Sequence, residues 1–117
     1  MSNNSDKPDA EFGLATGAAM DTTSLVEYAD GSIVSRALID NKSGSITLFA
    51  FAKGQALSEH STPHHAFVEV LDGAAEFTIG GKRVAAHKGQ LLVLPADIPH
   101  AVRAEENFKM ALTMLRT

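Results

Sequence analysis

Residues 66–87, AFVEVLDGAAEFTIGGKRVAAH, contain three short apolar runs separated by two glycine-containing turn signals. The runs at 66–71, 75–79 and 82–85 have the length of β-strands, and Asp72-Gly73 separates the first from the second. Gly80-Gly81 predicts a two-residue hairpin turn, because glycine reaches the positive φ that such turns need without steric cost. This stretch therefore predicts strands that pair locally, and not a helix.

The same pattern of short apolar runs and turn residues extends over the rest of the chain. Further strands are predicted at residues 24–28, 33–39, 45–52, 91–94, 101–104 and 109–115. Together they amount to about ten short strands at a spacing typical of all-β sandwiches and barrels. No stretch keeps a helical apolar period for more than about two turns. The sequence therefore predicts an all-β fold.

Length, composition and charge exclude several classes of protein. The chain has 117 residues, which predicts one domain, and it has no cysteine, which excludes disulfides, thiolate ligands and a cysteine nucleophile. The net charge of −4 gives no basic footprint for nucleic acid, and no apolar run approaches the length of a membrane helix. Residues 1–11 predict a flexible tail and residues 12–117 a single domain. With no signal-peptide pattern, we expect a cytoplasmic protein.

Two segments of the chain carry a family resemblance. Residues 54–73 read GQALSEHSTPHHAFVEVLDG, and residues 89–100 read GQLLVLPADIPH. In order, they resemble the two consensus motifs of the cupin superfamily. Gly89, Pro95 and His100 keep the spacing of the second motif, with Asp97 in place of its second glycine. The resemblance covers residues 31–117 and implies an all-β, cupin-type double-sheet jelly-roll β-barrel.

The resemblance also implies a metal site, from which this chain departs at two of four positions. His60 and His100 match the first and last family ligands, whereas Thr62 and Ala66 stand at the other two. Neither threonine nor alanine is a normal ligand of a transition metal. On the family register His64 shares the inward parity of Ala66. We therefore predict His60, His64 and His100 as ligands of a divalent transition metal such as Zn, Fe, Ni or Mn.

An alternative register remains open at this point, because Pro63 can shift the local pairing. A bulge there would turn His65 and Glu69 inward and give a histidine–carboxylate site with His60 and His100. A second alternative is a metal-free barrel that binds or senses a ligand, with His60 and His100 lining its pocket. Met110, Leu112 and Met114 are predicted to line the barrel in either case.

The functional expectation is a histidine-rich, metal-binding pocket for a small polar molecule, with catalysis left undecided. The partners we expect are a small-molecule ligand and a second copy of the chain, with neither nucleic acid nor a membrane. A homodimer is expected because residues 45–52, SITLFAFA, are apolar on both faces, so that something must cover the outer one. The resemblance supports this expectation, since many cupins dimerise.

Overall fold

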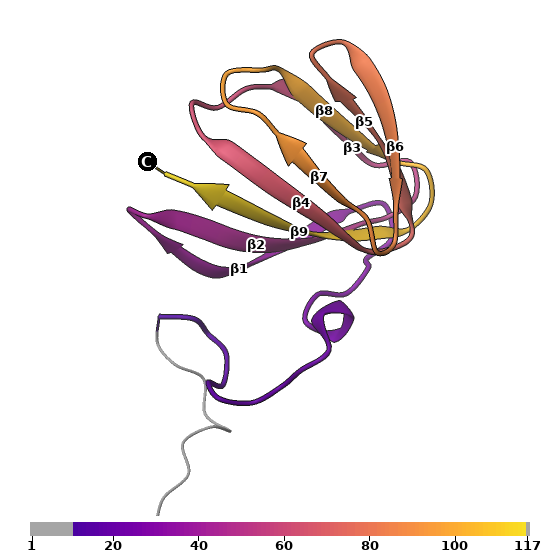
Figure 1. Cartoon of the computed structure of the whole chain (residues 1–117). Helices are drawn as coiled ribbons and strands as arrows, with labels where there is room; N and C mark the ends of the chain where they lie inside the picture. Colours follow the sequence, from indigo (N-terminus) through magenta and orange to yellow (C-terminus); the bar gives the residue numbers. More distant parts are fainter. Residues whose placement is uncertain (1–10, 117) are drawn as a thin grey trace, which may run out of the picture.

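The computed structural model of the chain describes residues 11–116, in which nine strands form two antiparallel sheets that face each other (Figure 1). The five-stranded sheet has the order β1 (Ile33–Asn41), β2 (Gly44–Phe51), β9 (Phe108–Leu115), β4 (His65–Asp72) and β7 (Leu91–Leu94). The four-stranded sheet has the order β3 (Ala56–His60), β8 (His100–Ala104), β5 (Ala74–Ile79) and β6 (Lys82–His87). The all-β, double-sheet architecture implied by the sequence is confirmed.

Most of the predicted strands are present, and the differences have local causes. The Gly80-Gly81 hairpin between β5 and β6 is confirmed, with φ values of 57° and 83°. The strand predicted at 24–28 is wrong, because the chain forms a 3-10 helix, η1, at Thr22–Ser24 and then irregular structure. β3 was not predicted, because its residues are mostly exposed and lack an apolar alternation. Apart from Glu11, the predicted tail lies outside the described residues.

Three phenylalanine rings join the two sheets. Phe51 and Phe108, on β2 and β9, have ring centroids 5.3 Å apart, and Phe108 meets Phe77 of the opposite sheet at 6.1 Å. All three side chains are at most 1% exposed. Burial of such large apolar side chains contributes on the order of 2–3 kcal/mol each. The rings therefore hold the sheets together at this point of the sandwich.

The strand β4 shows which face of its sheet is the inner one. Ala66, Val68 and Val70 are buried between the sheets, while His65, Phe67 and Glu69 are exposed on the outer face. The predicted inward parity of the even-numbered residues is therefore confirmed. Met110, Leu112 and Met114 of β9 also belong to or pack against the core between the sheets, as predicted.

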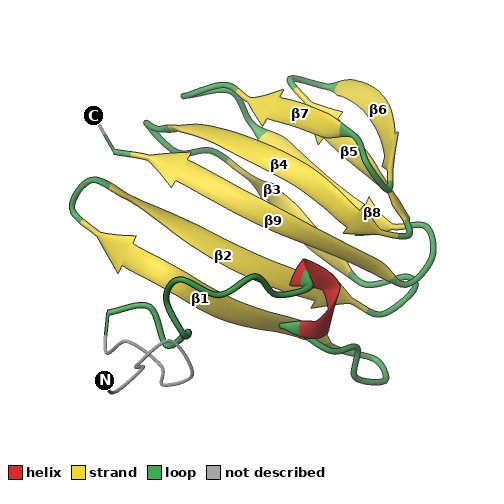
Figure 2. Cartoon of the chain, turned by 60° about the horizontal axis from the view of Figure 1, so that its bottom comes forward, coloured by secondary structure: helices red, strands yellow, loops and turns green. Residues whose placement is uncertain are grey.

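Residues 11–32, the N-terminal segment, pass over the outer face of the five-stranded sheet (Figure 2). Val26 is buried there in a second apolar cluster with Leu48, Ala50 and Leu71. The apolar outer side of residues 45–52 is thus covered by the chain itself. The sequence argument for a second subunit rested on this outer face of residues 45–52 being uncovered. Because the N-terminal segment covers it, that argument no longer supports a homodimer.

Polar contacts fix the N-terminal segment to the sheet. The buried ammonium group of Lys109 donates to the carbonyl oxygen of Thr23 and lies 4.8 Å from the centre of the Tyr28 ring. The Tyr28 hydroxyl donates to Asp72 Oδ2 at 2.6 Å. Burial, together with this bond to a carboxylate, raises the pKa of Tyr28, so that its hydroxyl stays protonated as a donor.

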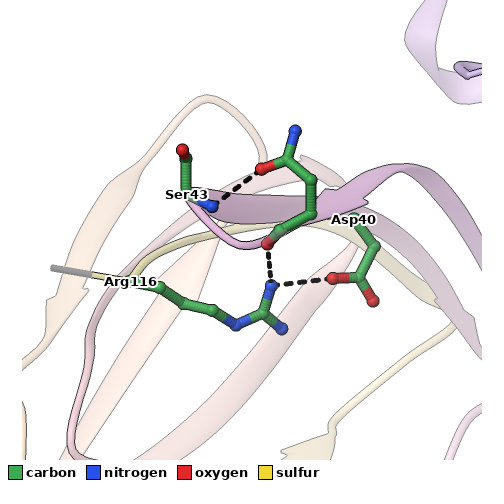
Figure 3. A network of polar contacts seen from close by, with 4 residues as sticks. Asp40, Ser43 and Arg116 are labelled. Carbon is green, nitrogen blue, oxygen red and sulfur yellow. Dashed lines mark hydrogen bonds and ion pairs between the residues drawn. The ribbon is translucent and has the colours of Figure 1, made fainter.

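The C-terminal end of β9 is held to the β1–β2 turn by Arg116 (Figure 3). Its Nη1 donates to Asp40 Oδ1 at 2.7 Å and to the carbonyl oxygen of Asn41 at 2.6 Å. The side chain of Asn41 in turn accepts the backbone N–H of Ser43 at 2.8 Å. Since these groups are mostly exposed, the ion pair adds at most about 1 kcal/mol.

No helix among residues 11–116 has the length and hydrophobicity needed to cross a membrane.

Gly73, in the turn between β4 and β5, should be irreplaceable by alanine. Its φ is +71°, and an added Cβ would lie 1.8 Å from the backbone oxygen of Asn107. Gly81 has φ +83° but open space around it. We expect Gly81→Ala to lower the free energy of unfolding by about 1–2 kcal/mol, and Gly73→Ala by roughly 1–3 kcal/mol more. Urea denaturation measures both, and equal losses would contradict the proposed close approach.

Candidate functional site

His60 and His100 are brought together by the pairing of β3 with β8. Leu57 pairs with Val102 and His60 with His100, so that β3 has one residue more than β8 between the two pairs. This is the count of a β-bulge. Because of the extra residue, Leu57 and His60 both line the same interior cavity although they differ in parity. The register thus places the two imidazoles side by side.

The two rings meet at their Nε2 edges. The Nε2 atoms are 3.1 Å apart, the ring centroids are 4.3 Å apart, and the rings are inclined at 72°. Nδ1 of His60 bonds to the carbonyl oxygen of Ser58 at 2.9 Å, and Nδ1 of His100 bonds to that of Ile98 at 3.3 Å. A carbonyl oxygen only accepts, so each Nδ1 carries the hydrogen. In the neutral pair, both Nε2 lone pairs therefore face each other.

The electrostatics keep His100 neutral. Burial lowers the pKa of its imidazole below the ordinary value, and the neighbouring His60 lowers it further, while the bond to Ile98 acts in the opposite direction. A neutral His100 keeps a free lone pair on Nε2. Two lone pairs at this distance repel each other unless a proton or a metal ion lies between them. The pair is therefore suited to binding a positive centre.

The separation of the two Nε2 atoms suits one metal ion, whereas the other side chains around the pair do not. Two imidazole nitrogens on one ion at ordinary Zn–N distances lie roughly 2.8–3.4 Å apart, which includes the observed 3.1 Å. Among residues 11–116, however, no group of three or more His, Cys, Asp or Glu side chains is placed to hold a metal. The site fits a two-nitrogen chelate with open positions, and does not fit a closed structural metal site.

The structure separates the other predicted candidates from this pair. His64 lies in the connection between β3 and β4, where its backbone N–H donates to Thr62 Oγ1 and its carbonyl accepts from the same hydroxyl. Among residues 11–116, His64 forms no trio with His60 and His100 that could hold a metal ion. His65 and Glu69 are exposed on the outer face of β4, so the alternative histidine–carboxylate site is wrong.

Two hydrogen bonds tie the β3–β4 connection to the turn that precedes His100. Asp97 has φ 65° and donates its N–H to the carbonyl oxygen of Thr62 at 2.7 Å. The next bond runs from the N–H of Ala96 to Nδ1 of His65 at 3.0 Å. Aspartate thus adopts the left-handed conformation at the position where the resemblance has glycine, as the sequence suggested. The turn positions the Ile98 carbonyl that orients His100.

A cavity of about 40 Å³ lies next to the histidine pair. Its remaining wall comes from both sheets and is apolar; it consists of Phe49, Leu57, Phe77, Leu94, Ala101, Val102, Met110 and Leu112. This apolar lining does not match the small polar molecule that the sequence suggested as the ligand. Leu57 was missed because the bulge in β3 breaks the period-two pattern that would identify it. Met110 and Leu112 were found from the alternation along β9.

Comparison with known proteins gives the family. A model described as the cupin domain matches residues 47–115. A conserved protein of unknown function from Streptococcus pyogenes is 37% identical over 86% of this chain and 89% of its own, with a TM-score of 0.83. A cupin 2 conserved barrel domain protein from Leptotrichia buccalis is 43% identical, with a TM-score of 0.80, over 82% of this chain and 47% of its own.

A cupin superfamily protein from Desulfitobacterium hafniense is 27% identical over 86% of this chain and 93% of its own, with a TM-score of 0.82. No functionally curated protein matches the chain. The matched family model covers more than half of the sequence, and its residues include every strand except β1 and part of β2. The chain therefore belongs to the cupin family.

Proposed function

We propose that the protein binds a divalent transition metal through Nε2 of His60 and Nε2 of His100, and that a small molecule completes the coordination from the adjacent cavity. The observation that carries the proposal is the 3.1 Å approach of two Nε2 atoms whose Nδ1 hydrogens are both bonded to carbonyls. Two fixed lone pairs that converge on one point are the arrangement that a metal ion satisfies.

The chemistry of such a centre follows from its open positions. A bound metal would act as a Lewis acid toward an oxygen of the small molecule. His60 and His100 would hold it, while the carbonyls of Ser58 and Ile98 keep both imidazoles in the tautomer that leaves Nε2 free. His64, the third ligand that the sequence predicts, would join this centre only if the connection between β3 and β4 turned inward.

Metal content tests the proposal directly. The purified protein, incubated in turn with Zn, Fe, Ni and Mn salts and then desalted, should retain about one metal ion per chain for at least one of them. We expect His60→Ala and His100→Ala to lower metal affinity by roughly 10–100-fold or more, because a single imidazole remains. His100→Gln repeats the test with a side chain of similar size, since His100 is only 9% exposed.

His87→Ala is the matched control, because His87 is an exposed histidine that pairs with Ala74, at the opposite end of β5 from Ile79, the partner of His100. It should keep the metal content of the parent protein. His64→Ala separates the two versions of the site: a loss of affinity includes His64 among the ligands, and unchanged affinity restricts the site to the pair. Absence of metal in the parent protein, or its full retention in His100→Ala, would refute the proposal.

The alternative function is a metal-free barrel that holds a small ligand. The observation in its favour is the replacement of two ligand positions of the family motif by Thr62 and Ala66. In that case chelation would leave the thermal stability of the protein unchanged, and the variants of His60 and His100 would alter ligand binding alone. Metal analysis and thermal unfolding with and without EDTA distinguish the two functions.

We also propose that two copies of the chain associate through the outer face of β4, β7 and β9. Four apolar side chains are exposed on this face, namely Phe67 at 36%, Leu91 at 64%, Val93 at 46% and Leu115 at 45%. Phe67 pairs with Val93, and the strands are neighbours, so the residues form one patch. A two-fold axis would set this patch against its own copy, so that the apolar side chains of both subunits would be buried face to face.

The oligomeric state tests this surface. We expect the parent protein to sediment as a dimer, and Val93→Lys to sediment as a monomer, because a two-fold interface would bring two added charges together. Met20→Lys changes an exposed apolar residue of the N-terminal segment and should leave the dimer intact. A parent protein that is monomeric at all accessible concentrations would refute the proposed interface.

A further inference from the structure

The connection between β7 and β8 begins where the hydrogen-bonded ladder between β4 and β7 ends. Ala66 and Leu94 form the last pair of that ladder, and the next residue after β7 is Pro95. Proline has no N–H, so the ladder cannot continue past it. The N–H of Ala96 therefore lies beyond the strand pairing, and Nδ1 of the His65 ring accepts it at 3.0 Å. A side chain thus replaces a backbone acceptor at this point.

The next residue of this connection has a strained backbone. Asp97 has φ 65°, in the left-handed region that costs free energy for every residue except glycine. Such a conformation persists where the surrounding structure fixes it by several contacts. Two consecutive N–H groups supply those contacts, since Ala96 donates to His65 and Asp97 donates to the carbonyl oxygen of Thr62 at 2.7 Å. The turn therefore depends on the start of β4 and on the residues that precede it.

The same turn sets the direction of the Ile98 carbonyl. The N–H of Ile98 closes the turn on the carbonyl oxygen of Pro95 at 3.4 Å, and the Ile98 carbonyl accepts from Nδ1 of His100 at 3.3 Å. Beyond it, the carbonyl oxygen of Pro99 accepts the N–H of Gly80 at 2.8 Å. The backbone is thus held on both sides of the Ile98 carbonyl. That carbonyl in turn decides which nitrogen of His100 carries the hydrogen.

The other tautomer of His100 competes with this one. Its Nε2 lies 3.1 Å from Nε2 of His60, whose own Nδ1 hydrogen is bonded to the carbonyl of Ser58. A hydrogen on Nε2 of His100 would be donated to the His60 lone pair, and the repulsion between two facing lone pairs would disappear. That tautomer would also remove the lone pair that the proposed metal needs. The bond from Nδ1 to Ile98 opposes it, so whatever fixes the Ile98 carbonyl also fixes the metal-binding tautomer.

We propose that His65 is a positioning residue that acts through the turn at Ala96 and Asp97 and keeps the hydrogen of His100 on Nδ1. The ring of His65 belongs to the exposed outer face of β4 and is not part of the cavity lining. Its effect on the pair therefore passes through the backbone and not through direct contact. As a role in metal binding, the inference rests on the proposed function, whereas the tautomer of His100 can be measured without any metal.

Long-range proton–nitrogen NMR spectra of the full-length, metal-free protein test the inference, because they show which ring nitrogen carries the hydrogen. At about pH 8.5, where imidazoles are neutral, the parent protein should carry it on Nδ1 of His100. His65→Leu removes the acceptor of Ala96 and should move the hydrogen of His100 to Nε2 in a measurable fraction of the molecules. His65→Asn keeps an acceptor oxygen and should restore the parent spectrum. His87→Leu makes the same change at an exposed histidine of β6 and should leave the spectrum of His100 unchanged.

A glycine at position 97 tests whether the effect passes through the turn. Glycine adopts a φ of 65° without strain, so in Asp97→Gly the turn needs less support from outside. His65→Leu should therefore shift less hydrogen to Nε2 of His100 in the Asp97→Gly background than in the parent protein. An equal shift in both backgrounds would mean that the effect of His65 bypasses the turn, and it would overturn the inference.

Metal titration separates this inference from the proposed function. If the parent protein binds metal, His65→Leu should lower its affinity about tenfold, the lower end of what supporting partners of a ligand contribute, and His65→Asn should restore it. Metal binding by a parent protein whose His100 hydrogen stays on Nδ1 in His65→Leu overturns the positioning role alone. A hydrogen that moves in His65→Leu, in a protein that binds no metal, overturns the metal site alone. A parent protein with the hydrogen on Nε2 of His100 overturns the positioning role outright.

Discussion

The contact of Phe51, Phe108 and Phe77 across the two sheets is the interaction on which the site depends. These rings are almost fully buried where they meet, and Phe49 continues the aromatic row along β2, 6.1 Å from Phe51. Beside Phe49 and Phe77 the packing gives way to the cavity with the two histidines. Because packed cores resist small changes in volume, the rings fix the separation of the sheets and hence the position of β3 and β8.

The outer face of the five-stranded sheet is divided into two regions with different covers. Over β1 and β2 the N-terminal segment buries Val26 against Leu48 and Ala50, and Lys109 binds it through the carbonyl of Thr23. A buried ammonium group without this carbonyl would be strongly destabilising, so the segment and the sheet stabilise each other. Over β4 and β7 the apolar side chains of Phe67, Leu91 and Val93 stay exposed.

The sequence predicted the fold and the pair His60 and His100 of the candidate site, and particular residues explain what was predicted and what was not. Period-two alternation in β4 and the Gly80-Gly81 turn are local signals, and both were interpreted correctly. The approach of His60 to His100 followed from the two motifs. β3 was missed because its bulge and its exposed side chains remove the alternation. The N-terminal cover was missed because Val26 contacts Leu48 through tertiary packing, which local propensity does not encode.

The two irregularities of the backbone near the site have a common consequence. The bulge in β3 turns the carbonyl of Ser58 toward Nδ1 of His60, and the left-handed turn at Asp97 precedes the carbonyl of Ile98 that binds Nδ1 of His100. In each strand the imidazole donates to the carbonyl two residues earlier, so both rings present Nε2 to the same point. The chain lacks the glycine and the carboxylate of the family motifs, but its backbone still directs both Nε2 lone pairs to the same point.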